Sequence, residues 1–165
     1  MCIAIQFTCW AQGPAGHTTA AKAYQVTNEE FIRECEHTGD AGIEVEAPSR
    51  ADLFACAAIG LARIMVAPEG IQPRQTHTIT VFGDSNDDLM HDALSDALDL
   101  FQCEGFIWRD VTVEECAGGI ELKLLGEQFS PYRHLMQTEL KSVTSGQLNV
   151  ECAQGEWKAR IVFDV

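Results

Sequence analysis

The stretch SRADLFACAAIGLARIM, residues 49–65, decides the fold class of this chain. Ser49, followed by Asp52 three residues later, is typical of a helix N-terminus. Pro68 and Gly70 are expected to end the helix. Between these signals, apolar residues recur at helical spacing and form a broad face that we expect to be buried: Leu53, Phe54, Ala57, Ala58, Leu61, Ile64 and Met65.

A second helix is predicted from residue 85 onward by the same pattern. Ser85 is its expected cap, with Asp88 three residues later, and its apolar stripe is Met90, Leu94, Ala97, Leu98 and Phe101. The remaining aspartates of this segment are Asp87, Asp92, Asp96 and Asp99. We interpret the acidic face as solvated charge rather than as a metal site, because no ligand-like loop accompanies it.

The rest of the body is typical of strands. Alternating or β-branched segments predict strands at 31–36, 42–47, 76–82, 106–114, 120–126, 139–144, 147–151 and 157–164. Two helices with a mainly antiparallel sheet make an α+β domain, which we expect over residues 31–165. Residues 1–30 are interpreted as an N-terminal extension, namely an added strand plus a linker.

Charge is the strongest global signal of the composition. The 165 residues include 11 Lys and Arg against 25 Asp and Glu, a net charge of −14. Such a surface repels phosphate backbones, so we expect no strong direct binding of nucleic acid; cations and basic protein surfaces are better partners. A simpler alternative is that the acidity only maintains solubility.

Other sequence features indicate a cytoplasmic protein without membrane contact. No apolar run approaches the roughly 20 residues of a membrane-spanning helix, and residues 1–10 lack the basic start of a secretory signal. The seven cysteines are scattered and form no C-x-x-C pair, which argues against a disulfide framework and a zinc site. We expect them to be reduced, with Cys56 and Cys103 packed as small apolar residues in helices.

Two places carry carboxylates that merit attention as cation ligands. The segment EHTGD, residues 36–40, holds two carboxylates and an imidazole between expected strands. In the last strand, alternation places Asp164 on the outer face, next to the terminal carboxylate of Val165. Spacing alone favours the alternative that Asp40 stabilises a turn and that Asp164 is a frayed terminal charge.

Acid–base chemistry has three histidine candidates, of which His77 and His91 are expected to be structural. A Ser-His-Asp set could be assembled from Ser142, His134 and Asp110, but no nucleophile elbow supports it. Phosphate-binding glycine motifs are also missing from the sequence.

Three stretches, in chain order, resemble the archease family. EHTGDAGI, residues 36–43, is similar to the family's (D/E)-H-T-A-D-x-G-I. HLMQTELKSVT, residues 134–144, is similar to H-x₄-E-(I/L)-K-A-V-T, and residues 157–165 end like the family's V-I-F-D-I. The resemblance covers residues 31–165 and implies an archease-like two-layer domain.

This resemblance also implies a metal site that joins the first and last motifs. By position its ligands would be Asp40, Asp164 and an oxygen of Val165, with Glu36 as a weaker neighbour. That implication reverses the preference drawn from spacing alone. Oxygen-only ligands favour calcium, with magnesium and manganese as alternatives.

The implied function is that of a protein cofactor rather than an enzyme. Archeases assist an RNA-splicing ligase that seals RNA ends in tRNA splicing and RNA repair, by promoting guanylylation and multiple turnover of the ligase. Three alternatives stay open. The first is a chaperone or modulator of a tRNA-modifying methyltransferase, and the second is a stand-alone metal-dependent hydrolase that uses Asp40, Asp164 and His37. A third is a calcium-binding module without a link to ligation. The chain departs from the family at Ser145 and Gly146, where Tyr-His is usual.

Overall fold

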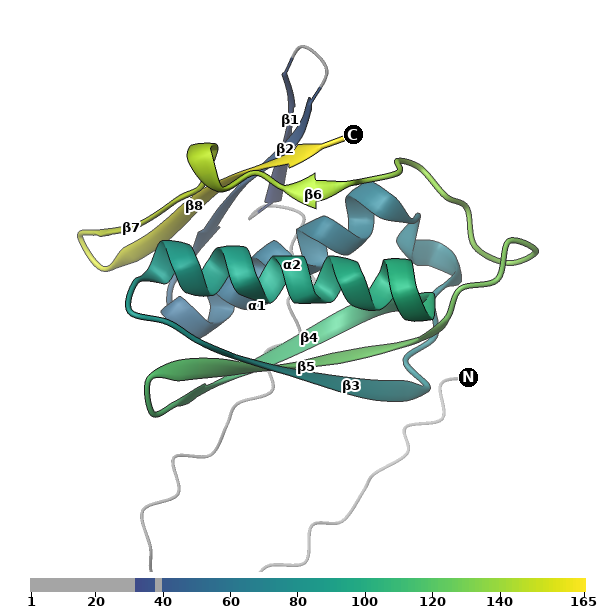
Figure 1. The fold of residues 1–165 in the computed structure, drawn as a ribbon, viewed down its shortest axis with the longest axis horizontal. Helices are drawn as coiled ribbons and strands as arrows, with labels where there is room; N and C mark the ends of the chain where they lie inside the picture. The colour runs from purple at the N-terminus through teal and green to yellow at the C-terminus, as the bar shows by residue number, and fades with distance from the viewer. Residues whose placement is uncertain (1–31, 38–39) are drawn as a thin grey trace, which may run out of the picture.

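A computed structural model describes residues 32–37 and 40–165, so the expected N-terminal extension lies outside the described residues. The described chain forms two antiparallel sheets and two long helices, which confirms the expected α+β class (Figure 1). Both helices lie between the sheets and contact strands of each. The described part therefore has three layers, where the resemblance implied two.

The first sheet contains the two ends of the described chain. Its strands are β1 (Ile32–His37), β2 (Asp40–Ala47), β6 (Ser142–Val143), β7 (Asn149–Ala153) and β8 (Glu156–Asp164). The order is β1-β2-β8-β6, and β7 also pairs with β8. Because β2 pairs with β8 along its whole length, the last strand of the domain lies beside one of the first.

The second sheet is a three-stranded antiparallel sheet of order β3-β5-β4. Its strands are β3 (Gln75–Phe82), β4 (Phe106–Cys116) and β5 (Gly119–Gln128). The strand expected at 139–144 is reduced to the two residues of β6. Residues before it bond elsewhere: the Gln137 amide, for example, donates to the Met65 carbonyl at 2.8 Å and so fastens this segment to the end of the first helix.

Helix α1 (Arg50–Met65) begins as its sequence predicts. The Ser49 hydroxyl accepts a hydrogen bond from the Asp52 amide at 3.2 Å and donates one to the Asp52 carboxylate at 2.6 Å. A short 3₁₀ turn, η2 (Pro68–Gly70), follows its end. Nearly all of α1 is buried, because it contacts the first sheet through β2 and β8 and the second sheet through β4.

Helix α2 (Asn86–Glu104) has the expected cap, with Ser85 accepting from the Asp88 amide at 3.1 Å, and it ends at Gly105 in the left-handed conformation. One expectation is wrong here: Cys103 is exposed, whereas Cys56 in α1 is buried as predicted. Cys103 lies in the last turn of α2, off the apolar stripe, and faces solvent. No helix in the described ranges is long and apolar enough to cross a membrane.

Candidate functional site

Strands β2 and β8 present one face to the core and the other outward. Ile43 and Val45 of β2 are buried, as are Ile161 and Phe163 of β8. Because side chains alternate along a strand, Asp40 and Asp164 belong to the other face of this strand pair. Val162 is on that face too, and it is buried. Asp164 is exposed there. In Figure 1 the yellow end of β8 lies beside β2, below the β1–β2 hairpin.

The register of this strand pair sets Asp40 directly opposite Asp164. Directly opposed residues of antiparallel strands share a face, with Cβ atoms about 4.5–5.5 Å apart. The tail of the domain therefore lies where the resemblance requires it to lie. Two carboxylates at this separation are able to reach one cation, since calcium–oxygen distances are about 2.3–2.6 Å.

The neighbouring pairs on the same face have a different charge pattern. Lys158 lies opposite Glu46 and bonds its carboxylate at 3.0 Å, and Arg160 lies opposite Glu44 at 4.0 Å. In both cases a base of β8 faces an acid of β2. At the end of the strands an acid faces an acid, an arrangement that destabilises a sheet unless positive charge is supplied.

A lysine lies at the same end of the sheet. The Lys141 amide donates to the Asp164 carbonyl at 2.8 Å, and the Lys141 ammonium donates to the Val165 oxygen at 2.7 Å. The oxygen of Val165 thus already accepts one strong bond, with a lone pair left over. A metal ion would compete with this ammonium for that oxygen, so the two aspartates are the stronger candidate ligands.

The first motif continues this row of strand partners. In the backbone register His37 is opposite Asp40, Asp40 is opposite Asp164, and Asp164 is opposite Ser142. The backbone of Glu36 pairs one residue further along, with Ala41. The side chains of Glu36 and His37 lie outside the described part of the structure.

The donor set fits a hard cation in kind. Two aspartate carboxylates and the Val165 main-chain oxygen are all oxygen ligands, the kind that calcium and magnesium prefer, and nitrogen or sulfur ligands are not needed. Within the described ranges, no group of three or more His, Cys, Asp or Glu side chains is placed to hold a metal ion. Asp40, Asp164 and Val165 are the expected ligands whose positions the structure describes, and by themselves they do not make up such a group.

His134 is a structural residue rather than an acid–base catalyst. It is 4% exposed, and its Nδ1 accepts a hydrogen bond from the Ser130 amide at 2.9 Å. The ring proton is therefore on Nε2, which lies 3.2 Å from the Glu127 carboxylate and donates to it. Both ring nitrogens are occupied, so the Ser142–His134–Asp110 set is not formed among the described residues.

Sequence reasoning missed Glu127, the buried acid at the centre of this network. Its carboxylate also accepts the Gln72 amide at 2.8 Å and two bonds from the Arg133 guanidinium, at 3.2 and 2.9 Å. The bonds from Arg133 lower its pKa to about 2, against the raising effect of burial and with help from Gln72 and His134. The signal in the sequence was an acid in the apolar strand LKLLGEQ, residues 122–128, followed by Arg133.

The network fastens a segment that carries exposed apolar side chains. Tyr132 is 97% exposed, Leu135 68% and Met136 41%. Arg133 and His134 lie between them in the chain and hold this segment against β5 through Glu127. The result is an apolar surface on an anchored loop, which is a common feature of protein contact sites.

These features define a class: a small α+β protein with two outward-facing carboxylates opposed on adjoining strands. Residues 33–165 match the model of the archease protein family. The chain belongs to the archease family. Archeases are not enzymes, as we expected for this chain.

Curated relatives match most of the chain. A protein archease from Methanopyrus kandleri is 31% identical over 136 residues, covering 80% of this chain and 97% of the relative. One from Pyrococcus abyssi is 29% identical over 135 residues, covering 79% of this chain and 95% of the relative.

Two solved structures share the fold. The solution structure of a protein from Methanobacterium thermoautotrophicum gives a TM-score of 0.66 at 19% identity, covering 82% of this chain and 99% of that one. A crystal structure from Thermotoga maritima, described as an archease and possible chaperone, gives a TM-score of 0.50 at 20% identity. The match covers 84% of this chain and 100% of that one. At these identities the likeness supports the fold alone.

Proposed function

We propose that this protein binds a divalent metal ion, calcium by preference, and activates an RNA-splicing ligase in tRNA splicing or RNA repair. Activation would consist of promoting guanylylation of the ligase and its repeated turnover. Family membership supports the class of function. The observation that carries the metal site is the like-charged pair Asp40–Asp164 on a face where the neighbouring Glu44 and Glu46 both meet a base.

The proposed ligands are Asp40 and Asp164, with the Val165 oxygen and Glu36 as weaker ones. Bound there, a divalent ion would supply the positive charge that this end of the sheet needs. Asp164 is exposed at the end of β8, so the site faces solvent and is accessible to a protein partner. Lys141 holds the end of β8 through two hydrogen bonds and so keeps Asp164 opposite Asp40.

The partner follows from the charge of the whole chain. At −14 the protein favours a basic protein surface and disfavours naked RNA. A ligase that itself binds RNA needs basic surface for its substrate, so it suits an acidic cofactor. We therefore place the ligase, rather than the RNA, in contact with the protein.

The test is a guanylylation assay with purified ligase, GTP and calcium, in which ligase turnover is measured with and without the full-length protein. Asp40→Ala and Asp164→Ala should stay folded and lose activation. Glu46→Ala removes an acid from the same face, outside the pair, and should activate normally. Full activation by either aspartate variant would refute the proposal.

A second candidate is a chaperone or modulator of a tRNA-modifying methyltransferase. It is favoured by the description of the Thermotoga relative as a possible chaperone and by the exposed apolar residues Tyr132, Leu135 and Met136. For this function, Leu135→Ser should lower protection of the methyltransferase from thermal aggregation, whereas Asp40→Ala should not. If the protein is instead a ligase activator, Asp40→Ala should abolish activation in the ligase assay and Leu135→Ser should not.

A stand-alone hydrolase is the remaining alternative. Turnover of a phosphate ester by the purified protein alone, with loss of turnover in Asp40→Ala, would support it. Two pockets of about 240 Å³ each lie among the described residues, and neither is lined by Asp40 or Asp164. Neither pocket therefore offers a substrate an enclosed place beside the pair.

A further inference from the structure

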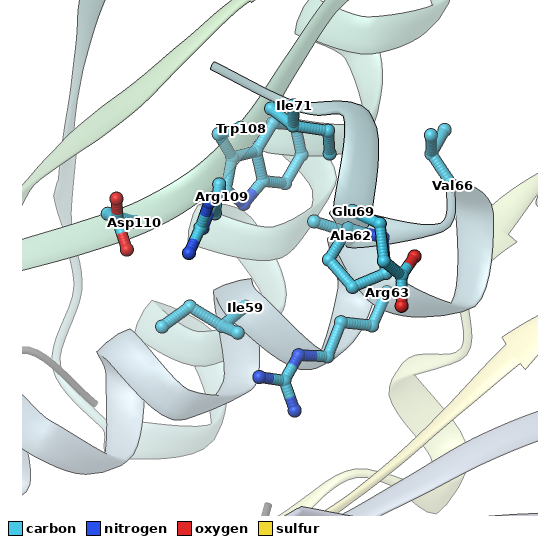
Figure 2. A pocket seen from close by; sticks show the side chains of 10 residues that line it. Ile59, Ala62, Arg63, Val66, Glu69, Ile71, Trp108, Arg109 and Asp110 are labelled. Carbon is cyan, nitrogen blue, oxygen red and sulfur yellow. The ribbon is translucent and has the colours of Figure 1, made fainter. Parts of the chain in front are cut away.

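A pocket of about 240 Å³ lies between α1, η2 and β4, away from the aspartate pair. We call it the α1–β4 pocket. Two arginines line it from different elements: Arg63 from the last turn of α1, and Arg109 from β4. Figure 2 shows the Arg109 side chain above Ile59 and the Arg63 guanidinium below it, so that Ile59 lies between the two in this view.

These two arginines and Arg33 differ from the other described arginines, which all have a carboxylate partner. Neither of the two pocket arginines makes a side-chain hydrogen bond or an ion pair with any residue in the described part. The contrast is with Arg50, Arg133 and Lys158, each of which is paired with a carboxylate. In a protein with 25 acidic residues and only 11 basic ones, two unpaired guanidinium groups on one pocket are available for an external anion.

The backbone of β4 is distorted where it carries Arg109. The strand register jumps between Trp108 and Asp110, so Arg109 is the extra residue of a β-bulge. A bulge changes the direction of a side chain, and such bulges are frequent next to functional sites. Gly126 on the partner strand accommodates the distortion, because a Cβ there would lie 1.8 Å from the Ile107 carbonyl oxygen.

The pocket combines this cationic side with an apolar floor. Ile59, Ile71 and Trp108 contribute to its walls, and the Trp108 indole N–H is already bonded to the Ala58 carbonyl at 2.9 Å. Glu69 and Asp110 stand at its edge, and neither makes an ion pair with the arginines. The two acids therefore do not neutralise the guanidinium groups. They would, however, repel a ligand that carries several negative charges.

We propose that the α1–β4 pocket binds a small organic anion: one phosphate or carboxylate group attached to a compact apolar group. A guanidinium group can donate two parallel hydrogen bonds to a phosphate or a carboxylate, and such charge-assisted bonds are roughly twice as strong as bonds between neutral groups. The volume lies below the roughly 300–1,000 Å³ of drug-sized ligand sites, which fits a molecule of about ten non-hydrogen atoms. The net charge of the chain disfavours a polyanion.

The experiment titrates the full-length protein with phenyl phosphate, benzoate and inorganic phosphate at low ionic strength, followed by calorimetry. We expect saturable binding of phenyl phosphate or benzoate, and at least about fivefold weaker binding of inorganic phosphate, because it lacks the apolar group. Binding of inorganic phosphate as tight as that of phenyl phosphate would contradict the role of the apolar floor.

Variants of the two arginines test the geometry. Arg63→Gln and Arg109→Gln should each weaken binding about tenfold, and the double variant should abolish saturable binding. Arg109→Lys keeps the charge but loses the fork, so its loss should be intermediate. Lys158→Gln removes one positive charge from the other sheet and should bind within about twofold of the unmodified protein.

Two outcomes would overturn the inference: no saturation by any of the three probes, or unchanged binding by the double variant. Circular dichroism melting shows whether each variant is folded. Calcium-dependent stabilisation of the same variants, which depends on Asp40 and Asp164, should be unaffected, so failure here leaves the proposed function standing.

Discussion

Asp40 and Asp164 face each other with like charge, whereas Glu44 and Glu46 on the same strand each face a base. Asp40→Asn removes the repulsion in metal-free protein. With EDTA present, we therefore expect the free energy of unfolding to rise by about 0.5 kcal/mol, the scale of an opposed pair of like charges. In calcium at 100 times its Kd the unmodified protein should gain about 2.7 kcal/mol, and Asp40→Asn should gain far less.

Thermal melts with EDTA and with calcium measure both effects. Glu46→Gln is the matched control: it loses an exposed ion pair worth about 0–1 kcal/mol and should keep the whole calcium response. An equal calcium response in Asp40→Asn would show that the aspartate pair is not the metal site.

Glu127 is the second residue with a measurable consequence. Glu127→Gln removes the carboxylate that accepts charge-assisted hydrogen bonds from Arg133 and His134 and puts a neutral amide in its place. We expect this change to lower the free energy of unfolding by about 2–3 kcal/mol. The pKa of Glu127 falls to about 2 on folding from an ordinary value of 4.5. Its contribution to stability is therefore complete above pH 4.5 and is lost as the pH falls through about 2.

The free energy of unfolding, measured with urea at several pH values between 6 and 3, tests this loss of stability. The fall in stability between pH 4.5 and pH 3 should be smaller in Glu127→Gln, because that variant has no proton to take up at this position. Glu114→Gln, at an exposed carboxylate 2.8 Å from the Lys123 ammonium, should change stability by less than about 1 kcal/mol. Parallel pH profiles for Glu127→Gln and the unmodified protein would contradict the assignment.

At the scale of elements, the bulge in β4 has its own test. Gly126→Ala places a methyl group 1.8 Å from the Ile107 carbonyl oxygen and 2.6 Å from the Trp108 Cα. Both contacts are with backbone and cannot be relieved by a side-chain rotation, so we expect a loss of about 3 kcal/mol or more. Denaturant unfolding measures it.

Gly146→Ala is the control for that substitution, because a Cβ added at Gly146 meets no atom within 4 Å. It should leave stability unchanged or raise it slightly, by up to about 1 kcal/mol, through the unfolded state. A similar, small effect of both substitutions would mean that β4 and β5 pair without the bulge.

The helices and strands also show which features of the fold depend on residues close together in the sequence. Ser49 and Ser85 cap the helices as predicted, because a cap depends on residues only three positions away. The bulge at Arg109 and the bonds around Glu127 depend on which strand or loop lies alongside, so no local pattern indicates them. Cys103 was misjudged for a related reason: helical position alone does not show which side of a helix is covered.

At the scale of the whole molecule, the number of layers and the position of the candidate site are both non-local. The periodicity of α1 predicted a broad buried face, but not that a second sheet covers the helix from the other side. Asp40 and Asp164 looked unrelated by spacing because their proximity is created by the pairing of β2 with β8, at opposite ends of the domain. The resemblance to archease supplied that connection, since motifs preserve positions whose contacts spacing does not reveal.

The net charge of −14 gives the last prediction, which concerns the encounter with the ligase. If the acidic protein meets a basic ligase surface, long-range attraction speeds their association, and salt screens it within about 10 Å at 0.1 M ionic strength. Raising sodium chloride from 50 to 500 mM should therefore slow association by about tenfold or more and change dissociation much less.

Surface plasmon resonance with immobilised ligase separates the two rates. Glu46→Gln and Asp40→Asn each remove one charge and should lower the association rate to a similar, small extent, because steering depends on summed charge rather than on one site. Only Asp40→Asn should also abolish calcium-dependent activation of the bound ligase. An association rate that does not respond to salt would mean that the acidity of this chain maintains solubility and does not guide it to its partner.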